Sequence, residues 1–421
     1  ALTPTAVGSA AVFLAAFVGT GGYIYYNTNV LNKQWTNSEQ IEFRAAYEND
    51  LKKFEFIVQP KIIDVNWKVE LYPKERSYKA TGIYTLKNTH KVAINKIHIQ
   101  KKIEANVVLS KVSFEGGTSV NNKYKKYDYV IYKLNKALQP GDSIKMSFVQ
   151  NYTTKGFELK NTNNNFAYNG TFFNNKNFPT LGYNRKYELR DKNDREDFNL
   201  PKRLNKARRE DTNELTNARS GSDSDGINLE ITIGTENNQT AIAPGNLIKK
   251  WEANNRNYFQ YKTAQPIINF YSIVSARYEV LKDQWISSKT KEVVDLEIYY
   301  HKGHEYNLER MMNSMKKSFE YYSLNFSSYQ YKHMRITEFP RYAEFAQSFP
   351  GTVPFSEAMG FVLNIDEEKD VDMAFYVTAH ELAHQWFGMQ IEAANVQGQH
   401  MILETLSQYA ALMVLKQHYS E

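Results

Sequence analysis

The sequence predicts an α+β protein of several domains, in which an apolar helix, a sheet-rich region and a helical region follow one another. The chain opens with an uncharged apolar stretch of the length that spans a membrane. From about residue 60 apolar and polar residues alternate with the period of a half-buried strand. Beyond residue 303 the apolar period becomes helical. With 421 residues the chain is long enough for two or three domains.

Residues 1–30 are expected to form a transmembrane helix. Val7–Tyr26 contains no charge, and at about 1.5 Å per residue it matches a hydrocarbon core of about 30 Å. Small residues at Ala11, Ala15 and Gly19 would let another helix approach closely. The expected partners are therefore membrane lipid and other transmembrane helices. A signal peptide and a buried soluble helix are the alternatives, although the stretch lacks the basic region of a signal peptide.

The rest of the chain divides by its pattern into three regions. Residues 31–59 are expected to be a polar helical stalk with an N-terminal capping signal. Residues 60–285 are expected to be a β-rich domain, interrupted at 185–226 by a charged surface excursion or, alternatively, a regulatory or partner-binding insert. Residues 286–421 are expected to form a third domain, truncated at its C-terminal end, and beyond Gly303 this domain contains a helix whose apolar face packs in a core. The residues of that face are Leu308, Met311, Met315, Phe319 and Tyr322.

Composition excludes several classes of function. Basic residues number 52 against 46 acidic ones, with no dominant basic block, so we expect no nucleic acid partner. The absence of cysteine excludes a thiol nucleophile, cysteine-ligated zinc and disulfides. The chain begins with Ala and stops inside a helical pattern, so we expect it to be a piece of a longer polypeptide.

The strongest chemical signal is the sequence His-Glu-Leu-Ala-His at positions 380–384. On a helix, His380 and His384 project from one face about one turn apart, so both imidazoles can reach one metal ion. Glu381 can take a proton from water at that ion's open position. A catalytic zinc site commonly has three protein ligands. Glu404, which opens the next helical run, is the expected third ligand, and His400 is the rival.

The flanking residues support a helix and leave the remaining histidines unassigned. Asp370 or Asp372 can cap the start of the helix, and Gly388 lies where a helix should stop. The other histidines are interpreted as surface or packing residues. They are His90, His98, His301, His304, His333 and His418.

Residues 380–388, His-Glu-Leu-Ala-His-Gln-Trp-Phe-Gly, resemble the zinc helix of the aminopeptidase N and leukotriene hydrolase family, which are gluzincin metallopeptidases. Glu404 and Tyr409 resemble the start of that family's third-ligand helix, Glu-Gly-Phe-Ala-x-Tyr. Pro354–Gly360 occupies the place of the family's Gly-Ala-Met-Glu-Asn-Trp-Gly motif. The resemblance covers residues 60–421 and implies a β-sandwich-like domain followed by the start of a thermolysin-like, mainly α catalytic domain.

The resemblance also implies how substrate is bound. Glu357 matches the motif's Glu, which binds the substrate's free α-amine, and a carboxylate there would select peptide N-termini. A buried structural Glu is the alternative. Gly351–Gly360 would be an edge strand beside the substrate. Asn269–Ser272 and Glu338–Tyr342 look like a bacterial branch in which the peptidase follows the membrane helices of an ABC-type exporter permease.

Three departures from the family pattern affect these expectations. Nineteen residues separate His384 from Glu404, where the family has eighteen, so the connecting loop differs. The motif is rewritten on both sides of Glu357, which affects substrate preference. The family's transition-state-stabilising Tyr lies beyond the third ligand and has no counterpart before residue 421.

The sequence thus predicts a membrane-tethered zinc aminopeptidase with one zinc per chain, acting on peptides at a bacterial inner membrane. The soluble part is expected on the extracytoplasmic side, although the flank that would fix the orientation is not in the sequence. The alternative belongs to another class, a peptidase-like binding or assembly module of an ABC-type transporter with weak or no turnover.

Overall fold

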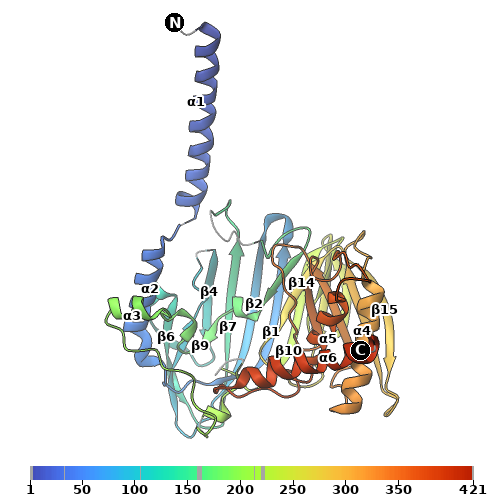
Figure 1. The fold of residues 1–421 in the computed structure, drawn as a ribbon. Coiled ribbons are helices and arrows are strands. Elements are labelled where there is room, and N and C mark those ends of the chain that lie inside the picture. The colour runs from blue at the N-terminus through green and yellow to red at the C-terminus, as the bar shows by residue number, and fades with distance from the viewer. Residues whose placement is uncertain are drawn as a thin grey trace.

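The computed structural model describes residues 3–32, 34–104, 106–158, 164–212, 214–219 and 223–419. A single long helix, α1 (Pro4–Tyr25), stands away from a body of sheets (Figure 1). None of the residues of α1 is buried, and the helix continues as a π-helical turn, Tyr26–Leu31, in which Asn27 and Thr28 are buried. Pro4–Leu31 is long and apolar enough to cross a membrane, and a signal sequence has the same properties.

The base of α1 is joined to the body by Tyr23 of its last turn and by Asn32, the residue after the π-helical turn. Asn32 donates hydrogen bonds to the carbonyls of Lys155 (2.7 Å) and Phe157 (3.2 Å). Tyr23 contacts the ring of Phe157, with 5.8 Å between the ring centroids. The apolar helix therefore meets the body at the loop that follows strand β7 (Ser143–Thr153).

The helix after α1 is α2 (Asn37–Leu51), and it begins with the capping box that the sequence indicates. Thr36 accepts a hydrogen bond from the backbone of Glu39, whose side chain bonds back to the backbone of Thr36. The helix is not a free stalk, because Tyr47 and Leu51 are fully buried against the body. Aromatic side chains from the sheet region provide the surface on which it packs.

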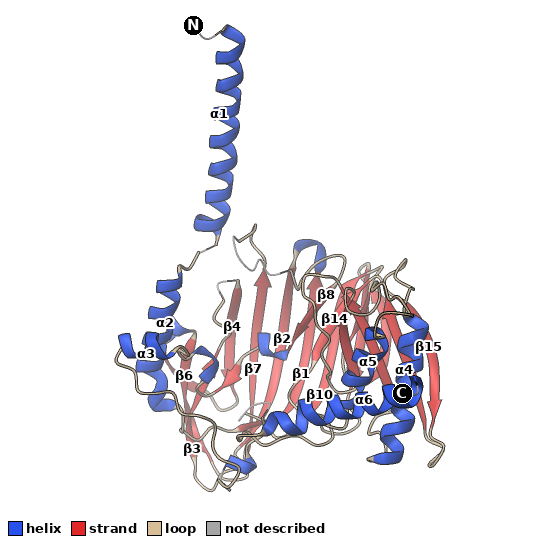
Figure 2. Ribbon diagram, in the orientation of Figure 1, coloured by secondary structure: helices blue, strands red, loops and turns tan. Residues whose placement is uncertain are grey.

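The body is built on a seven-stranded sheet in the order β12-β13-β10-β1-β2-β7-β4, antiparallel except for β1 beside β10 (Figure 2). The period-two alternation predicted from residue 65 onward is present in β1, where Val65, Trp67, Val69 and Leu71 are at most 2% exposed. The strands are β1 (Lys61–Tyr72), β2 (Ser77–Lys87), β4 (Val107–Phe114), β7 (Ser143–Thr153), β10 (Asn228–Glu236), β12 (Asn246–Ala253) and β13 (Arg256–Lys262).

Two smaller sheets share a hydrophobic core with the seven-stranded sheet. Trp67 of β1 lies against Phe178, with 3.9 Å between ring centroids, and against Tyr271. One sheet has the order β5-β6-β3-β9 and the other β11-β14-β8. Their strands are β3 (Ile94–Gln100), β5 (Thr118–Asn121), β6 (Tyr129–Leu138), β8 (Thr171–Asn174), β9 (Thr180–Leu181), β11 (Thr240–Ile242) and β14 (Ser272–Ala276).

The charged segment expected at 185–226 as a surface excursion is partly buried. It contains a short helix, α3 (Lys192–Asp197), whose Arg195 is 4% exposed and pairs with Glu48 of α2. Further along, Ala207 and Ala218 form backbone bridges with residues 396 and 394. The segment therefore holds α2 on one side and the loop before Glu404 on the other.

The C-terminal part combines a four-stranded sheet with three helices, which gather at the end of the body opposite α2 (Figure 1). The sheet order is β15-β16-β17-β18, and β16, β17 and β18 are parallel. The elements are β15 (Glu279–Ile286), β16 (Val293–Tyr300), β17 (His333–Phe339), β18 (Thr352–Ser356), α4 (Leu308–Asn325), α5 (Met373–Ala383) and α6 (Leu406–Tyr419).

This sheet changes one expected division of the chain. The predicted boundary at residue 285 falls inside β15, which pairs along its length with β16 and so belongs with the later strands. The apolar face predicted for α4 is buried in the same core as these strands, with Met311, Met315, Phe319 and Tyr322 fully inaccessible. The protein is a mixed α+β protein with a sheet-rich body and an N-terminal apolar helix.

Candidate metal centre

Helix α5 positions the two histidines of the metal motif. The side chain of Asp372 caps the helix by accepting a hydrogen bond from the backbone N–H of Phe375 (2.8 Å). His380 lies in the last turn and His384 is the C-terminal capping residue. Their rings meet edge to face at an interplanar angle of 88°, and the two Nε2 atoms are 3.2 Å apart. The helix thus presents two nitrogen donors toward one point.

Glu404 reaches the same point from the next helical segment. It lies in a π-helical turn, Met401–Thr405, that leads directly into α6. One of its carboxylate oxygens, Oε2, is 3.6 Å from His380 Nε2 and 3.5 Å from His384 Nε2. His400, the rival third ligand, is exposed and lies outside this group of donors. The fold therefore brings together His380, His384 and Glu404.

The spacing of these three donors fits a zinc ion. Bonds of about 2.0–2.1 Å at tetrahedral angles separate neighbouring ligand atoms by about 3.3 Å. The three observed separations lie between 3.2 and 3.6 Å. Nδ1 of His384 is 3.1 Å from the carbonyl oxygen of Phe387, which holds the proton on Nδ1 and leaves Nε2 free to bind a metal. The residues present therefore fit the metal that the motif implies.

The charges at the centre favour an acceptor carboxylate at Glu404 and a buried base at Glu381. The facing imidazoles of His380 and His384 lower the pKa of Glu404. Glu381 is 7% exposed, and burial raises its pKa, while His384 and His380 partly oppose that shift. A buried carboxylate beside the two imidazoles of the motif has the properties of a general base.

Glu357, the residue predicted to bind the α-amine, directly follows β18. Its Oε1 accepts a hydrogen bond from the backbone N–H of Arg341 (2.9 Å). It belongs to a second group of metal-compatible donors, together with His301, His304 and Glu338, whose ligand atoms lie within 4.8 Å of one another. His301 and His304, which the sequence indicates are surface or packing residues, thus lie beside two carboxylates.

β18 lies at the edge of its sheet, as the family resemblance implies for this segment, and that edge is partly covered. Residues 345–349 run antiparallel to β18 and form backbone bridges at Phe355 and Thr352. Gln385, the neighbour of His384, is fully buried and bonds to this hairpin through Ser348 and the backbone of Gly351. Sequence reasoning did not identify Gln385, which ties the metal helix to the segment beside β18.

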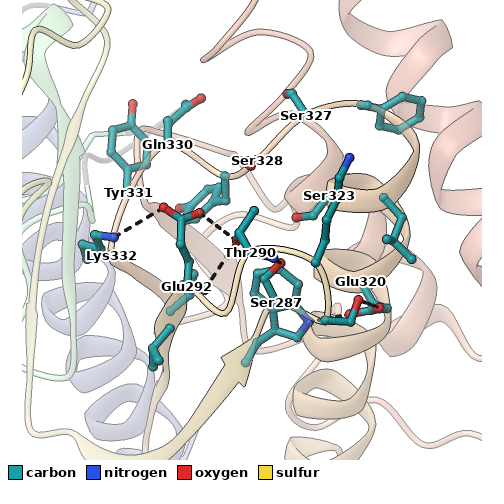
Figure 3. A pocket seen from close by; sticks show the side chains of 18 residues that line it. Ser287, Thr290, Glu292, Glu320, Ser323, Ser327, Ser328, Gln330, Tyr331 and Lys332 are labelled. Carbon is teal, nitrogen blue, oxygen red and sulfur yellow. Dashed lines mark hydrogen bonds and ion pairs between the residues drawn. The ribbon is translucent and has the colours of Figure 1, made fainter.

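Two pockets lie away from these residues. A pocket of about 290 Å³ lies between α4 and the turn after β15, where Glu292 pairs with Lys332 (Figure 3). A larger cleft of about 1390 Å³ runs along the 185–206 segment and reaches Asn395, in the loop before Glu404. Neither lining includes the metal-motif residues.

The comparisons with known proteins show the fold. No family model and no curated protein matches the sequence. Among solved structures, a mutant M1 zinc metallopeptidase from Deinococcus radiodurans is similar with a TM-score of 0.57 at 13% identity, over 86% of this chain and 72% of that chain. A mutant of that enzyme bound to a Tyr-Ser-Ala substrate has a TM-score of 0.57 at 14% identity, with the same coverage. The chain therefore has a peptidase-like fold of the M1 type.

Proposed function

We propose that this chain is the membrane-tethered, zinc-binding part of an aminopeptidase that hydrolyses the N-terminal peptide bond of peptides. The observation that carries the proposal is the convergence of His380, His384 and Glu404 beside the buried Glu381. Similarity to the M1 fold supports it independently of these residues. The tether is Pro4–Leu31, and its membrane location and association with an exporter permease rest on the sequence.

Each residue has a role that its position supports. His380, His384 and Glu404 would hold zinc, which supplies an activated water when bound. Glu381 would accept a proton from that water and then donate it to the leaving amine. Glu357 would pair with the substrate's α-ammonium, so that only peptides with a free N-terminus fit.

One observation favours the alternative, a peptidase-like binding or assembly module of a membrane transporter. The hydrogen-bonding edge of β18, where a substrate backbone is expected to lie, is occupied by residues 345–349. Gln347 donates its N–H to Pro354, and Ser356 donates to Phe345. A substrate peptide would have to displace these bonds or bind elsewhere. A module that does not cleave peptides does not need this edge to be open.

The test compares one peptide in two forms on the complete polypeptide. The substrate is Tyr-Ser-Ala, free and N-acetylated, and the measured quantity is kcat/KM for wild type, Glu357→Ala and the exposed control Glu344→Ala. Removing one partner of a desolvated charge pair costs about 2–5 kcal/mol, or about 30- to several-thousand-fold in kcat/KM. We expect that loss for the free peptide in Glu357→Ala alone.

Two outcomes contradict the proposal in different ways. Equal cleavage of the acetylated and free peptides by wild type would identify an endopeptidase and leave Glu357 a structural residue. No turnover of either form by the zinc-loaded complete polypeptide would favour the binding or assembly module.

A further inference from the structure

The second group of donors lies where three parallel strands end. His301 directly follows β16, Glu338 is the penultimate residue of β17, and Glu357 directly follows β18. Because the strands are adjacent and parallel, their carboxyl ends meet at one edge of the sheet. Such edges are where α/β sheets commonly bind ligands. The pairing of the three strands therefore brings these donors together.

A tight turn adds the fourth donor. The N–H of His304 donates to the carbonyl of His301 (3.0 Å), which closes a type II turn. Gly303 occupies the third position of this turn and has a φ of +94°. A side chain at that φ would be strained, so glycine is needed there. The turn reverses the chain and places the His301 and His304 rings 5.8 Å apart, both facing Glu338.

Glu338 is fully buried, and its charge has no cationic partner of fixed charge. Its Oε1 lies 3.4 Å from His301 Nδ1 and is hydrogen-bonded to His304 Nδ1, while Oε2 accepts the backbone N–H of His301 (2.6 Å). Within the described ranges neither Glu338 nor Glu357 forms an ion pair with a Lys or Arg side chain. Buried carboxylates are ordinarily paired with a cation or coordinated to a metal.

We infer that His301, His304 and Glu338 bind a second divalent transition-metal ion, with Glu357 as an exchangeable fourth donor. Two imidazoles and one or two carboxylates are the donors of a zinc-type site. With neutral imidazoles, the two carboxylates carry a charge of about −2, which a divalent ion balances. The ion would take the place of the hydrogen bond between His304 and Glu338.

The surrounding contacts hold these donors as outer contacts hold metal ligands. Tyr278 donates its hydroxyl to the backbone carbonyl of Glu338 (2.6 Å), and its ring stacks on His301 at an angle of 6°. Nε2 of His301 is buried and has no partner among the described residues, so Nδ1 is the nitrogen that faces the group. These contacts fix the His301 ring and the backbone of Glu338.

This site shares Glu357 with the proposed aminopeptidase. The proposed site keeps three ligands without Glu357, namely His301, His304 and Glu338. Glu357 can therefore leave the ion and pair with a substrate's α-amine. The sequence predicts one zinc per chain, and this inference raises the number to two. Its test counts bound ions and does not depend on turnover, so its failure is distinct from failure of the aminopeptidase proposal.

The experiment measures zinc per chain by elemental analysis. The complete polypeptide is stripped with chelator, reloaded with zinc and freed of excess metal. We expect two zinc ions in wild type and one in His304→Ala, Glu338→Gln and His384→Ala. The double variant His304→Ala/His384→Ala should hold none, and the exposed control His400→Ala should hold two.

The test remains decisive if one of the variants does not fold, because a second variant and a second measurement are available. Glu338 is fully buried, whereas the His304 side chain is 30% exposed in a turn, so His304→Ala keeps the test decisive. Titration with Co²⁺ followed by visible absorption should show two binding steps in wild type and one in His304→Ala. One zinc in wild type, lost in His384→Ala and unchanged in His304→Ala, would overturn the second site and leave the first intact. Two zinc ions retained in His384→Ala would instead overturn the ligand assignment of the first.

Discussion

Replacing Glu381 by Gln separates the proposed general base from the metal ligands. The substitution keeps the shape of a side chain that is 7% exposed, so it creates no cavity. The backbone of Ser348 lowers the pKa of Glu381 and so opposes the effect of burial, and the amide of Gln can take the place of the carboxylate beside that backbone. Gln cannot accept a proton, so the variant should lose the chemistry and keep the fold and the metal.

The expected size of the effect follows from what is removed. General base catalysis contributes about 10²- to 10⁴-fold, so kcat should fall by that factor. This corresponds to an increase of about 2.7–5.4 kcal/mol in the activation barrier. His380 and His384 keep their ring positions, so zinc content should match that of wild type.

The assay measures kcat for Tyr-Ser-Ala on the complete polypeptide, with zinc content and thermal unfolding of the same samples. Glu309→Gln, an exposed position in the first turn of α4, is the matched control and should behave as wild type. A zinc-replete Glu381→Gln variant that retained more than about a tenth of wild-type kcat would refute the reasoning. Glu381 would then only orient a ligand.

Two further predictions concern stability. Glu48→Ala should lower the free energy of unfolding by about 3–5 kcal/mol, because it leaves the Arg195 guanidinium, 4% exposed and bonded to Glu48 twice at 2.7 Å, buried without its partner. Urea denaturation measures this loss, and an unchanged midpoint would show that the pair contributes nothing. Burial lowers the pKa of His98 to about 4, so the folded state resists a proton that the unfolded state accepts near pH 6.5. The free energy of unfolding should therefore be at its full value above pH 6.5 and fall by about 3 kcal/mol as the pH drops to 4. His98→Gln should remove this pH dependence, and His400→Gln should retain it.

The sequence by itself determined the features whose physics is local. The spacing of His380 and His384 is a property of one helical turn, and the capping box of α2 lies within four residues. The apolar face of α4 and the alternation in β1 follow from one-dimensional periods, and both are buried as predicted. Glu404 followed from a short connection between two helical runs, which left little choice of placement.

The tertiary structure decided what depends on pairing between distant segments. Glu48 and Arg195 are separated by 147 positions and meet because α2, which the sequence predicts as a polar helical stalk, packs on the body. The membership of β15 in the later sheet and the covered edge of β18 depend on which strands pair, and alternation alone does not specify a partner.

The donors His301, His304, Glu338 and Glu357 show the same limit most clearly. No helical or strand period links them, and the histidines flank a glycine that argues against a helix. They converge because three strands run parallel in one register and their ends share an edge. A local motif can place two donors together in advance, whereas donors at strand ends come together only once the sheet has formed.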